Sequence, residues 1–200
     1  MAADQLGVAG LALDQELAVW NANASPGPGH EIRSMTLATS SVSSIANEAV
    51  DIRAFALDAV SIYYSTFDIL GAVRSVPRGG GTPTTLLDQL TFPRRPAVAD
   101  GQVFASTGDG LIVSAPVSGG ARTVVADLQG QALGNIAIDG DRIYFATLGP
   151  KASFFMVGTN GQGLAKIADS DPELTSNDIA VDAGYLYFAS THGVMRLAKP

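Results

Sequence analysis

A short strand–turn–strand pattern recurs five times along the chain and constrains its fold more than any other feature. Residues 136–147 show it best, with an apolar run, a turn at Asp139-Gly140-Asp141, and a second run rich in β-branched and aromatic residues. An aspartate ends the first run in every repeat, and successive aspartates lie 44, 42, 39 and 43 residues apart (Asp14, Asp58, Asp100, Asp139 and Asp182). A period of about 40 to 45 residues with four strands per unit is typical of propeller blades. The sequence therefore predicts an all-β fold, a β-propeller of four-stranded antiparallel blades.

Five repeats are visible, and we expect the last one to lack its outer strand. The predicted blades span about residues 11–54, 55–96, 97–135, 136–178 and 179–200. Residues 1–10 resemble the end of a fourth strand, because Asp4-Gln5-Leu6 matches Asp88-Gln89-Leu90. Residues 1–4 are expected either to close the last blade as a very short strand or to end a preceding blade. The chain is thus predicted to be a single propeller domain or a segment of one, and its two ends favour the segment.

Small residues recur in the first strand of the repeats, at Ala12, Ala56, Ala137 and Ala180, with Val98 as the exception. The first strand of a blade lies nearest the propeller axis, where neighbouring blades crowd one another. We therefore expect these alanines to line the central channel.

Composition excludes several classes of protein. Charged residues make up only 16% of the chain and the net charge is −7, so the chain has neither the composition of a disordered segment nor a clustered basic face for nucleic acid or an anionic membrane. No apolar run approaches the roughly 20 residues that span a bilayer. Cysteine is absent, which excludes disulfides and thiolate metal sites. The first residues do not form a signal peptide, so the compartment stays undetermined.

The five repeated aspartates allow two interpretations. They could form a ring of carboxylates around a channel, or each could shape the turn between two strands by binding its own backbone. We favour the turn role, because a residue that the fold requires is expected at the same place in every repeat.

The densest acidic cluster consists of Asp169, Asp171, Glu173 and Asp178, which we consider as calcium ligands because Ca²⁺ takes six to eight oxygens. Their spacing does not match a calcium-binding loop, and Pro172 interrupts them. A solvated loop between blades is the preferred interpretation, and no metal or cofactor site is predicted.

The remaining candidate residues also favour structural roles. His30 and His192 are the two histidines, and they could share a metal only if the first and last blades were adjacent. Gly79-Gly80-Gly81 is predicted to form a hairpin turn, since no helix follows it to complete a phosphate site. Aromatic residues of the second strands are expected to pack between blades, whereas Tyr185 is expected to be partly exposed. No catalytic residue is predicted.

The second strands read V-W-N-A, Y-Y-S-T, F-A-S-T, Y-F-A-T and Y-F-A-S, and residues 73–87 read VRSVPRGGGTPTTLL. These motifs resemble the YWTD-type β-propellers of the low-density-lipoprotein-receptor class, and most of all their bacterial relatives. The resemblance implies the architecture and a location outside the cytoplasm. The family's fourth motif residue, an aspartate that ties blades together, is replaced here (Ala22, Thr66, Thr107, Thr147 and Ser190), so no functional residue is carried over.

The preferred function is a non-catalytic scaffold that binds a protein or a small ligand through its loops or channel mouth. The alternative is a propeller enzyme, a metal-assisted hydrolase or lyase, with part of its site outside this chain. An enzyme should place unlike polar residues from several blades at one channel mouth, and the apolar first strands do not favour this. We expect a monomer that can self-associate at the open edge of its last blade.

Overall fold

The computed structural model describes residues 10–23, 29–149, 152–170 and 174–200, which form five antiparallel sheets and contain no helix. The five sheets follow one another along the chain and are called blades 1 to 5. Their strands are β1 (Leu11–Leu13), β2 (Leu17–Asn23), β3 (His30–Thr36) and β4 (Ser41–Glu48); β5 (Ile52–Leu57), β6 (Ser61–Thr66), β7 (Gly71–Pro77) and β8 (Thr84–Leu90); β9 (Ala97–Ala99), β10 (Gln102–Ser106), β11 (Leu111–Pro116) and β12 (Thr123–Asp127); β13 (Leu133–Asp139), β14 (Arg142–Thr147), β15 (Ser153–Gly158) and β16 (Ala165–Asp169); and β17 (Leu174–Val181), β18 (Tyr185–Ser190) and β19 (Gly193–Ala198).

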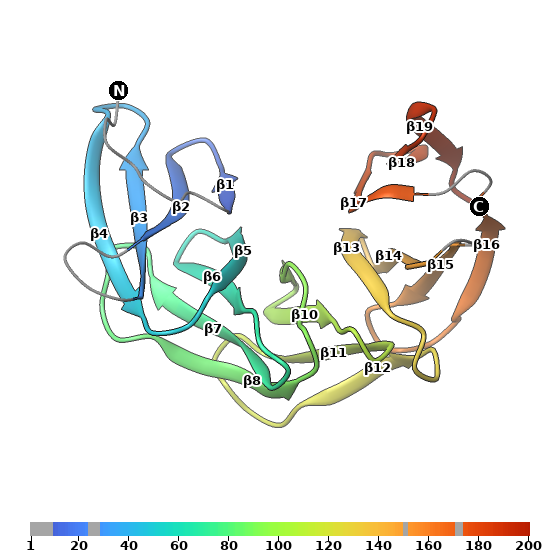
Figure 1. Cartoon of the computed structure of the whole chain (residues 1–200), viewed down its shortest axis with the longest axis horizontal. Coiled ribbons are helices and arrows are strands. Elements are labelled where there is room, and N and C mark those ends of the chain that lie inside the picture. The colour runs from blue at the N-terminus through green and yellow to red at the C-terminus, as the bar shows by residue number, and fades with distance from the viewer. Residues whose placement is uncertain (1–9, 24–28, 150–151, 171–173) are drawn as a thin grey trace.

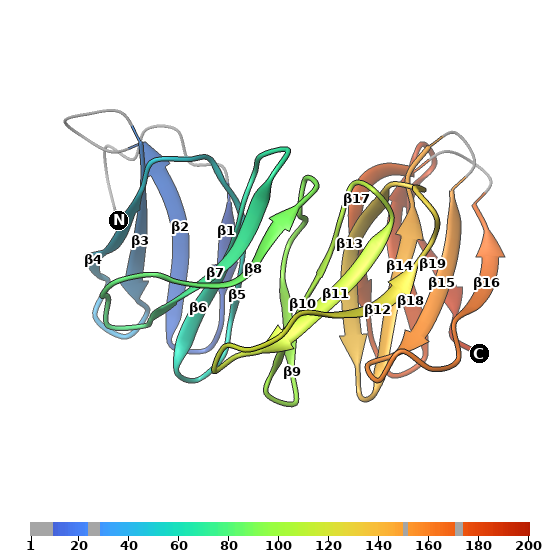
Figure 2. The ribbon, with the colours of Figure 1, turned by 90° about the horizontal axis from the view of Figure 1, so that it is seen from below.

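The blades stand side by side around a common axis and form an open arc (Figure 1). The first strands β1, β5, β9, β13 and β17 contact one another in that order at the centre of the arc. Figure 2 shows the same sheets from below, with blades 1 to 4 following one another from left to right and blade 5 overlapping blade 4. An opening separates blade 1 from blade 5 (Figure 1). The predicted propeller of four-stranded blades is confirmed, and among the described residues the last sheet has three strands, as expected.

The first strands of blades 2, 4 and 5 begin earlier than the apolar runs suggested, at Ile52, Leu133 and Leu174. In each of them the register with the second strand shifts before the apolar run begins. Such a bulge inserts extra residues into one strand and bends it. The inserted residues include Arg53, Asn135 and Asp178, so the bulges carry polar side chains to the inner rim of the arc.

Blades 2, 3 and 4 bury apolar side chains on both faces, because successive residues of a strand point to opposite sides of a sheet. Four apolar clusters result, one at each joint between consecutive blades. Tyr144 and Phe145 illustrate the rule. Phe145 packs toward blade 3 and Tyr144 toward blade 5, and they are 0% and 5% exposed respectively. The second-strand aromatics of the inner blades are therefore core residues.

The hydroxyls at the fourth motif position act within their own blades. The Oγ atoms of Thr66, Thr107 and Thr147 accept backbone N–H groups of Ala72, Leu111 and Ser153 at 2.9, 3.0 and 2.9 Å. Each bond joins the second strand to the start of the third. These threonines are at most 5% exposed and close the connection between the two strands rather than tying neighbouring blades.

We predict that replacing Phe145 with alanine lowers the free energy of unfolding by about 3 to 5 kcal/mol, because it leaves a cavity in the joint between blades 3 and 4. Tyr144→Ala should act similarly at the next joint. Urea denaturation followed by far-UV circular dichroism measures both. Val124→Ala is the control, since this strand residue is 52% exposed and its truncation should cost less than about 0.5 kcal/mol. Small effects at both aromatic positions would contradict the assigned joints.

Candidate functional site

The first strands of the blades line an open cavity of about 510 Å³ at the centre of the arc. Its walls combine backbone and small or aliphatic side chains from all five blades, including the predicted alanines Ala12, Ala56, Ala137 and Ala180. Larger apolar side chains complete the wall, among them Leu11, Leu13 and Phe55. The side chains of Asp14 and Arg95 also line it. The cavity is therefore mostly apolar, with one acidic and one basic group.

Arg95, Asn135 and Asp178 meet at the inner rim, although they come from three different blades or connections. The Arg95 backbone N–H donates to Asn135 Oδ1 at 2.9 Å, and Asn135 Nδ2 donates to Asp178 Oδ1 at 2.6 Å. The guanidinium of Arg95 lies 3.3 Å from the same carboxylate oxygen. The side chains of Arg95 and Asp178 are 38% and 60% exposed. Such an exposed ion pair contributes at most about 1 kcal/mol, so a ligand carboxylate can compete for Arg95.

Arg94 stabilises this rim through hydrogen bonds to the backbone of two blades. Its backbone N–H donates to the Ser106 carbonyl at 2.9 Å, and its Nε donates to the Leu133 carbonyl at 3.1 Å. Burial lowers the pKa of Arg94, and the positive charge of Arg53 lowers it further. Arg53 in turn lies over the ring of Phe67, 4.2 Å from its centroid. The two neighbouring arginines therefore have different roles. Arg94 holds blades 3 and 4 together, and Arg95 faces the cavity.

The turns between first and second strands lie at the opposite end of the blades. Asp14, Asp58 and Asp182 each accept two backbone N–H groups, from the residues two and three positions later, at 2.7 to 2.9 Å. The predicted turn role is confirmed for these three. Asp100 and Asp139 behave differently. Asp100 is itself a central turn residue with a φ of 49°, and Gly140 after Asp139 has a φ of 55°, so the prediction of an identical role in all repeats is wrong.

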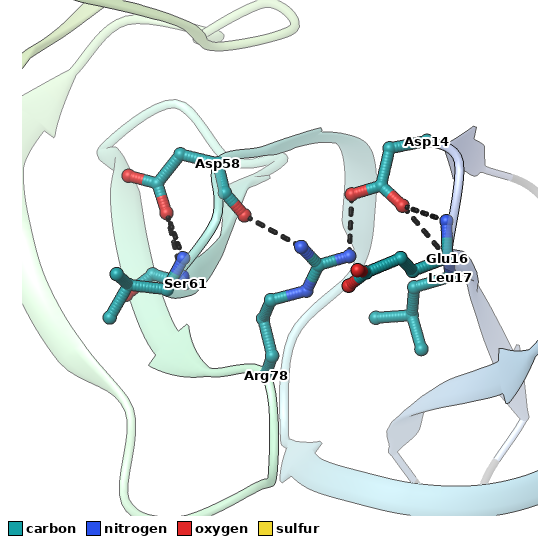
Figure 3. A network of polar contacts seen from close by, with 7 residues as sticks. Asp14, Glu16, Leu17, Asp58, Ser61 and Arg78 are labelled. Atoms are coloured by element: carbon teal, nitrogen blue, oxygen red, sulfur yellow. Dashed lines mark hydrogen bonds and ion pairs between the residues drawn. The ribbon is translucent and has the colours of Figure 1, made fainter.

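A basic residue joins two of these turns across a blade joint. Arg78, the first residue after β7, donates to Asp14 Oδ2 of blade 1 at 2.5 Å and to the Asp58 carbonyl of its own blade at 3.1 Å (Figure 3). Burial raises the pKa of Asp14, but the bonds from the Glu16 and Leu17 backbone and from Arg78 outweigh it and hold that pKa below its usual value.

Lys199 occupies the same position after β19 and repeats the contact. Its Nζ donates to the Asp139 carboxylate of blade 4 and to the Asp182 carbonyl of its own blade, the latter at 2.7 Å. Its hydrogen bond to Asp139 raises the pKa of Lys199.

Two of the turn aspartates bind a tyrosine of their own blade instead of a basic residue from the next blade. Tyr63 donates to Asp58 Oδ2 at 2.6 Å, and Tyr187 donates to Asp182 Oδ2 at 2.7 Å. Burial and the bond to Asp58 raise the pKa of Tyr63 to about 12.

A second polar tie joins blades 1 and 2 near their outer strands. Arg74 Nη1 donates to both carboxylate oxygens of Glu48, at 2.5 and 2.6 Å, and the Tyr64 hydroxyl donates to Glu48 Oε1. The Glu48 side chain is only 6% exposed. Burial raises the pKa of Tyr64, and the neighbouring Glu48 carboxylate raises it further. The carboxylate is thus satisfied by a cation and a hydroxyl from the next blade.

The structure separates the described members of the predicted calcium cluster. Asp169 ends the outer strand β16, where it accepts from Ser153 Oγ at 2.6 Å and contacts Lys166, whereas Asp178 lies on the inner strand β17. Asp171 and Glu173 lie outside the described residues. Within those residues, no three histidine, aspartate or glutamate side chains gather as metal ligands would.

The other candidates are also placed. His30 begins β3 and pairs with Asp51 at 2.7 Å, and His192 lies in the turn before β19, so the opening in the arc keeps the two histidines apart (Figure 1). Tyr185 is partly exposed, as predicted, with the Arg196 guanidinium 4.4 Å from its ring centroid. No helix that could cross a membrane occurs among the described residues.

Sequence reasoning missed Asn135 and the basic cross-blade residues, and it considered Asp178 only as a calcium ligand. Two signals could have found them. Asn135 and Asp178 each immediately precede the apolar run of their blade, and Arg78 and Lys199 each follow the third strand.

Comparison with solved structures places this geometry in one class. The chain resembles a chain in the crystal structure of a nidogen–laminin complex, over 96% of this chain and 75% of that one, with 15% identity and a TM-score of 0.73. It also resembles the WD40 β-propeller domain of Doa1 (99% and 66%, 12% identity, TM-score 0.70) and the computationally designed protein Ika8 (96% and 58%, 14% identity, TM-score 0.68). The chain is a β-propeller by fold, and it spans less than two thirds of the last two structures.

No protein-family model matches the sequence, and no curated protein matches it. At identities of 12 to 15%, the likeness to the solved structures extends to the fold alone.

We predict that Glu48→Ala destabilises the protein by about 3 kcal/mol, because it leaves Arg74 and Tyr64 without their shared acceptor in a mostly buried joint. Asp51→Ala is the matched control, since that carboxylate is 70% exposed and its pair with His30 contributes less than about 1 kcal/mol. Urea denaturation at neutral pH compares the two. Equal losses would show that the Glu48 cluster is not a structural tie.

We predict that Arg78→Met costs about 1 to 2 kcal/mol near neutral pH, and that this cost shrinks in acid. The folded protein holds the pKa of Asp14 below the ordinary 3.8. The associated stability is therefore complete above pH 3.8 and is lost as the pH falls through the folded pKa. Urea midpoints of both proteins between neutral pH and pH 3 should converge below about pH 4. Arg122→Met, which alters an exposed arginine, should show no such convergence.

Proposed function

We propose that this chain is a non-catalytic binding scaffold of the YWTD type, and that its channel receives part of a protein partner. The observation that carries the proposal is the cavity of about 510 Å³, walled by the first strands of all five blades with Arg95 and Asp178 at its inner rim. Binding sites of this kind are mostly apolar and contain a few placed polar groups that orient the ligand.

The chemistry of the cavity defines the partner segment. Leu11 and Leu13 are 64% and 66% exposed beside the cavity and offer apolar contact. Arg95 provides a cation whose ion pair with Asp178 is exposed and weak. Asp14, in contrast, already binds Arg78 and two backbone N–H groups. A protein segment that inserts an aliphatic or aromatic side chain and directs a carboxylate to Arg95 fits these groups.

The inner rim is suited to recognition rather than to proton transfer. Its polar groups include Arg94, Arg95, Asn135 and Asp178, which are bound to one another and to backbone carbonyls. A hydrolase or lyase would require a nucleophile or general base held within reach of a reacting atom. Arginine and amide groups instead supply directional contacts to a ligand carboxylate.

Selection of short random peptides on the immobilised protein tests the proposal, followed by binding measurements with variants. Peptides enriched in an apolar residue near an acid should be selected. Ala180→Trp, which fills the cavity from an exposed position, and Arg95→Gln, which removes the cation, should each weaken binding at least about tenfold. Val60→Trp is the matched control, because Val60 is 72% exposed and is not part of the cavity wall. Undiminished binding to both cavity variants would overturn the proposal.

A further inference from the structure

Two arginines lie at equivalent places in blades 2 and 3. Arg53 and Arg94 each stand three residues before the first-strand alanine that pairs with the first aromatic residue of the second-strand motif (Ala56 and Ala97). The two first strands, β5 and β9, contact each other. The repeat therefore brings the two guanidiniums to the same end of one joint, inside the array of blades.

The two side chains have many unused hydrogen-bond donors. Arg94 donates its Nε to the Leu133 carbonyl at 3.1 Å. Its two terminal nitrogens, and the whole guanidinium of Arg53, have no acceptor among the residues that the structure describes. The buried side-chain atoms without a partner belong to other residues (His30, Ser65 and Arg74). The unused donors of Arg53 and Arg94 are thus accessible to solvent.

The negative charges at this end of the blades are engaged elsewhere. Four carboxylates lie in the connections and bulges there, and each has other partners (Asp51 with His30, Asp68 with the Ile69 backbone, Asp109 with Thr91 and Thr107, Asp178 with Arg95). Within the described ranges, neither Arg53 nor Arg94 forms an ion pair. Their two positive charges are therefore not compensated by any acid of those ranges.

The two arginines influence each other, and aromatic rings hold them in place. Burial lowers the pKa of Arg94, and the positive charge of Arg53 lowers it further. The Arg53 guanidinium lies 4.2 Å from the ring centroid of Phe67, and that ring packs against Phe92 with 5.3 Å between centroids. Contact with a ring orients the planar guanidinium, so less conformational freedom is lost when it binds a ligand.

The backbone that leads to Arg94 is strained. Phe92 has a φ of 45°, in the left-handed region that residues other than glycine seldom adopt. Its N–H donates to the Asp68 carbonyl at 3.1 Å, which ties the connection before β9 to the loop after β6. Such strain is kept where the surrounding structure enforces it, and it is concentrated at binding sites. Here it places the Phe92 ring against Phe67, two residues before Arg94.

We propose that Arg53 and Arg94 form a binding site for a doubly charged oxyanion, a phosphate or sulfate group. The planar N–H forks of two guanidiniums match the oxygens of such a group, and its two negative charges balance the two arginines. A carboxylate carries one negative charge and leaves one arginine uncompensated. The group belongs either to a free ion or to an ester. The site uses neither Arg95 nor the cavity, so it goes beyond the proposed function.

An NMR titration of the full chain with sodium sulfate, sodium phosphate and sodium acetate tests the proposal. The Nε–Hε signals of the arginine side chains report on each guanidinium separately. Sulfate and phosphate should shift the Arg53 and Arg94 signals saturably, whereas acetate should bind at least about tenfold more weakly. Sodium chloride keeps the ionic strength constant, because salt screens exposed charges.

A matched pair of variants shows whether the arginines act as a site. Arg53→Gln changes an exposed side chain and should weaken sulfate binding at least about tenfold. Arg122→Gln removes the same charge from an exposed position of blade 3 and should change sulfate binding less than about twofold. Equal urea midpoints of Arg53→Gln and the unaltered chain show that the fold is preserved.

Phenyl phosphate distinguishes the two sources of the oxyanion. Ile69 and Leu70, in the loop after β6, are 62% and 63% exposed and offer apolar contact to the body of an ester. Binding at least about threefold tighter than that of inorganic phosphate supports an ester as the ligand. Equal affinities support the free ion.

Two results would overturn the proposal. One is the lack of a saturable shift at Arg53 and Arg94 with either sulfate or phosphate, or an equal shift of all arginine signals. The other is sulfate binding that is lost in Arg95→Gln and kept in Arg53→Gln, which places the anion at the cavity rim. That second result leaves the proposed binding of a partner in the channel intact, so the two proposals fail separately.

Discussion

Packing of one blade against the next is the interaction on which the structure depends. A single four-stranded sheet exposes apolar side chains on both faces, because successive residues of a strand alternate. Phe145 and Tyr144 are buried only because blades 3 and 5 cover the two faces of blade 4. The stability of such an array is approximately a sum of blade terms and nearest-neighbour terms. Val194, which is 80% exposed, shows the consequence where no further blade packs on the sheet within the part of the chain that the structure describes.

Polar contacts at the joints add directionality to this apolar packing. Arg78 and Lys199 each connect the turn of their own blade with the aspartate of the preceding blade. Glu48 accepts from Arg74 and Tyr64 across the first joint. Because each group donates or accepts at a fixed place, these ties set the rotation of one blade against the next, which apolar contact alone does not fix. They are unequal among the joints, so repeats that are alike in sequence need not be alike in stability.

The inner rim shows how a repeated scaffold produces an asymmetric site. Bulges in the first strands of blades 4 and 5 bring Asn135 and Asp178 beside Arg95, which comes from the connection into blade 3. The apolar first strands had suggested a channel without distinctive polar groups. The residues that differ between repeats lie just before these apolar runs, where the strands lengthen toward the axis. A bulge depends on the fit of neighbouring blades, and the periodicity of the sequence does not record it.

The sequence by itself determined the number of blades, the order of strands and the burial of the second-strand aromatics in blades 1 to 4, whereas Tyr187 and Phe188 of blade 5 are only partly buried. These follow from local alternation and from a repeat of about 40 residues, both of which act within one blade. Only the tertiary structure decided that Asp139 binds Lys199 while Asp58 binds Tyr63, because the Lys199 contact joins residues of two different blades. It also decided that the two histidines lie apart and that Arg95 meets Asp178. These outcomes depend on distances between blades, which local sequence patterns do not encode.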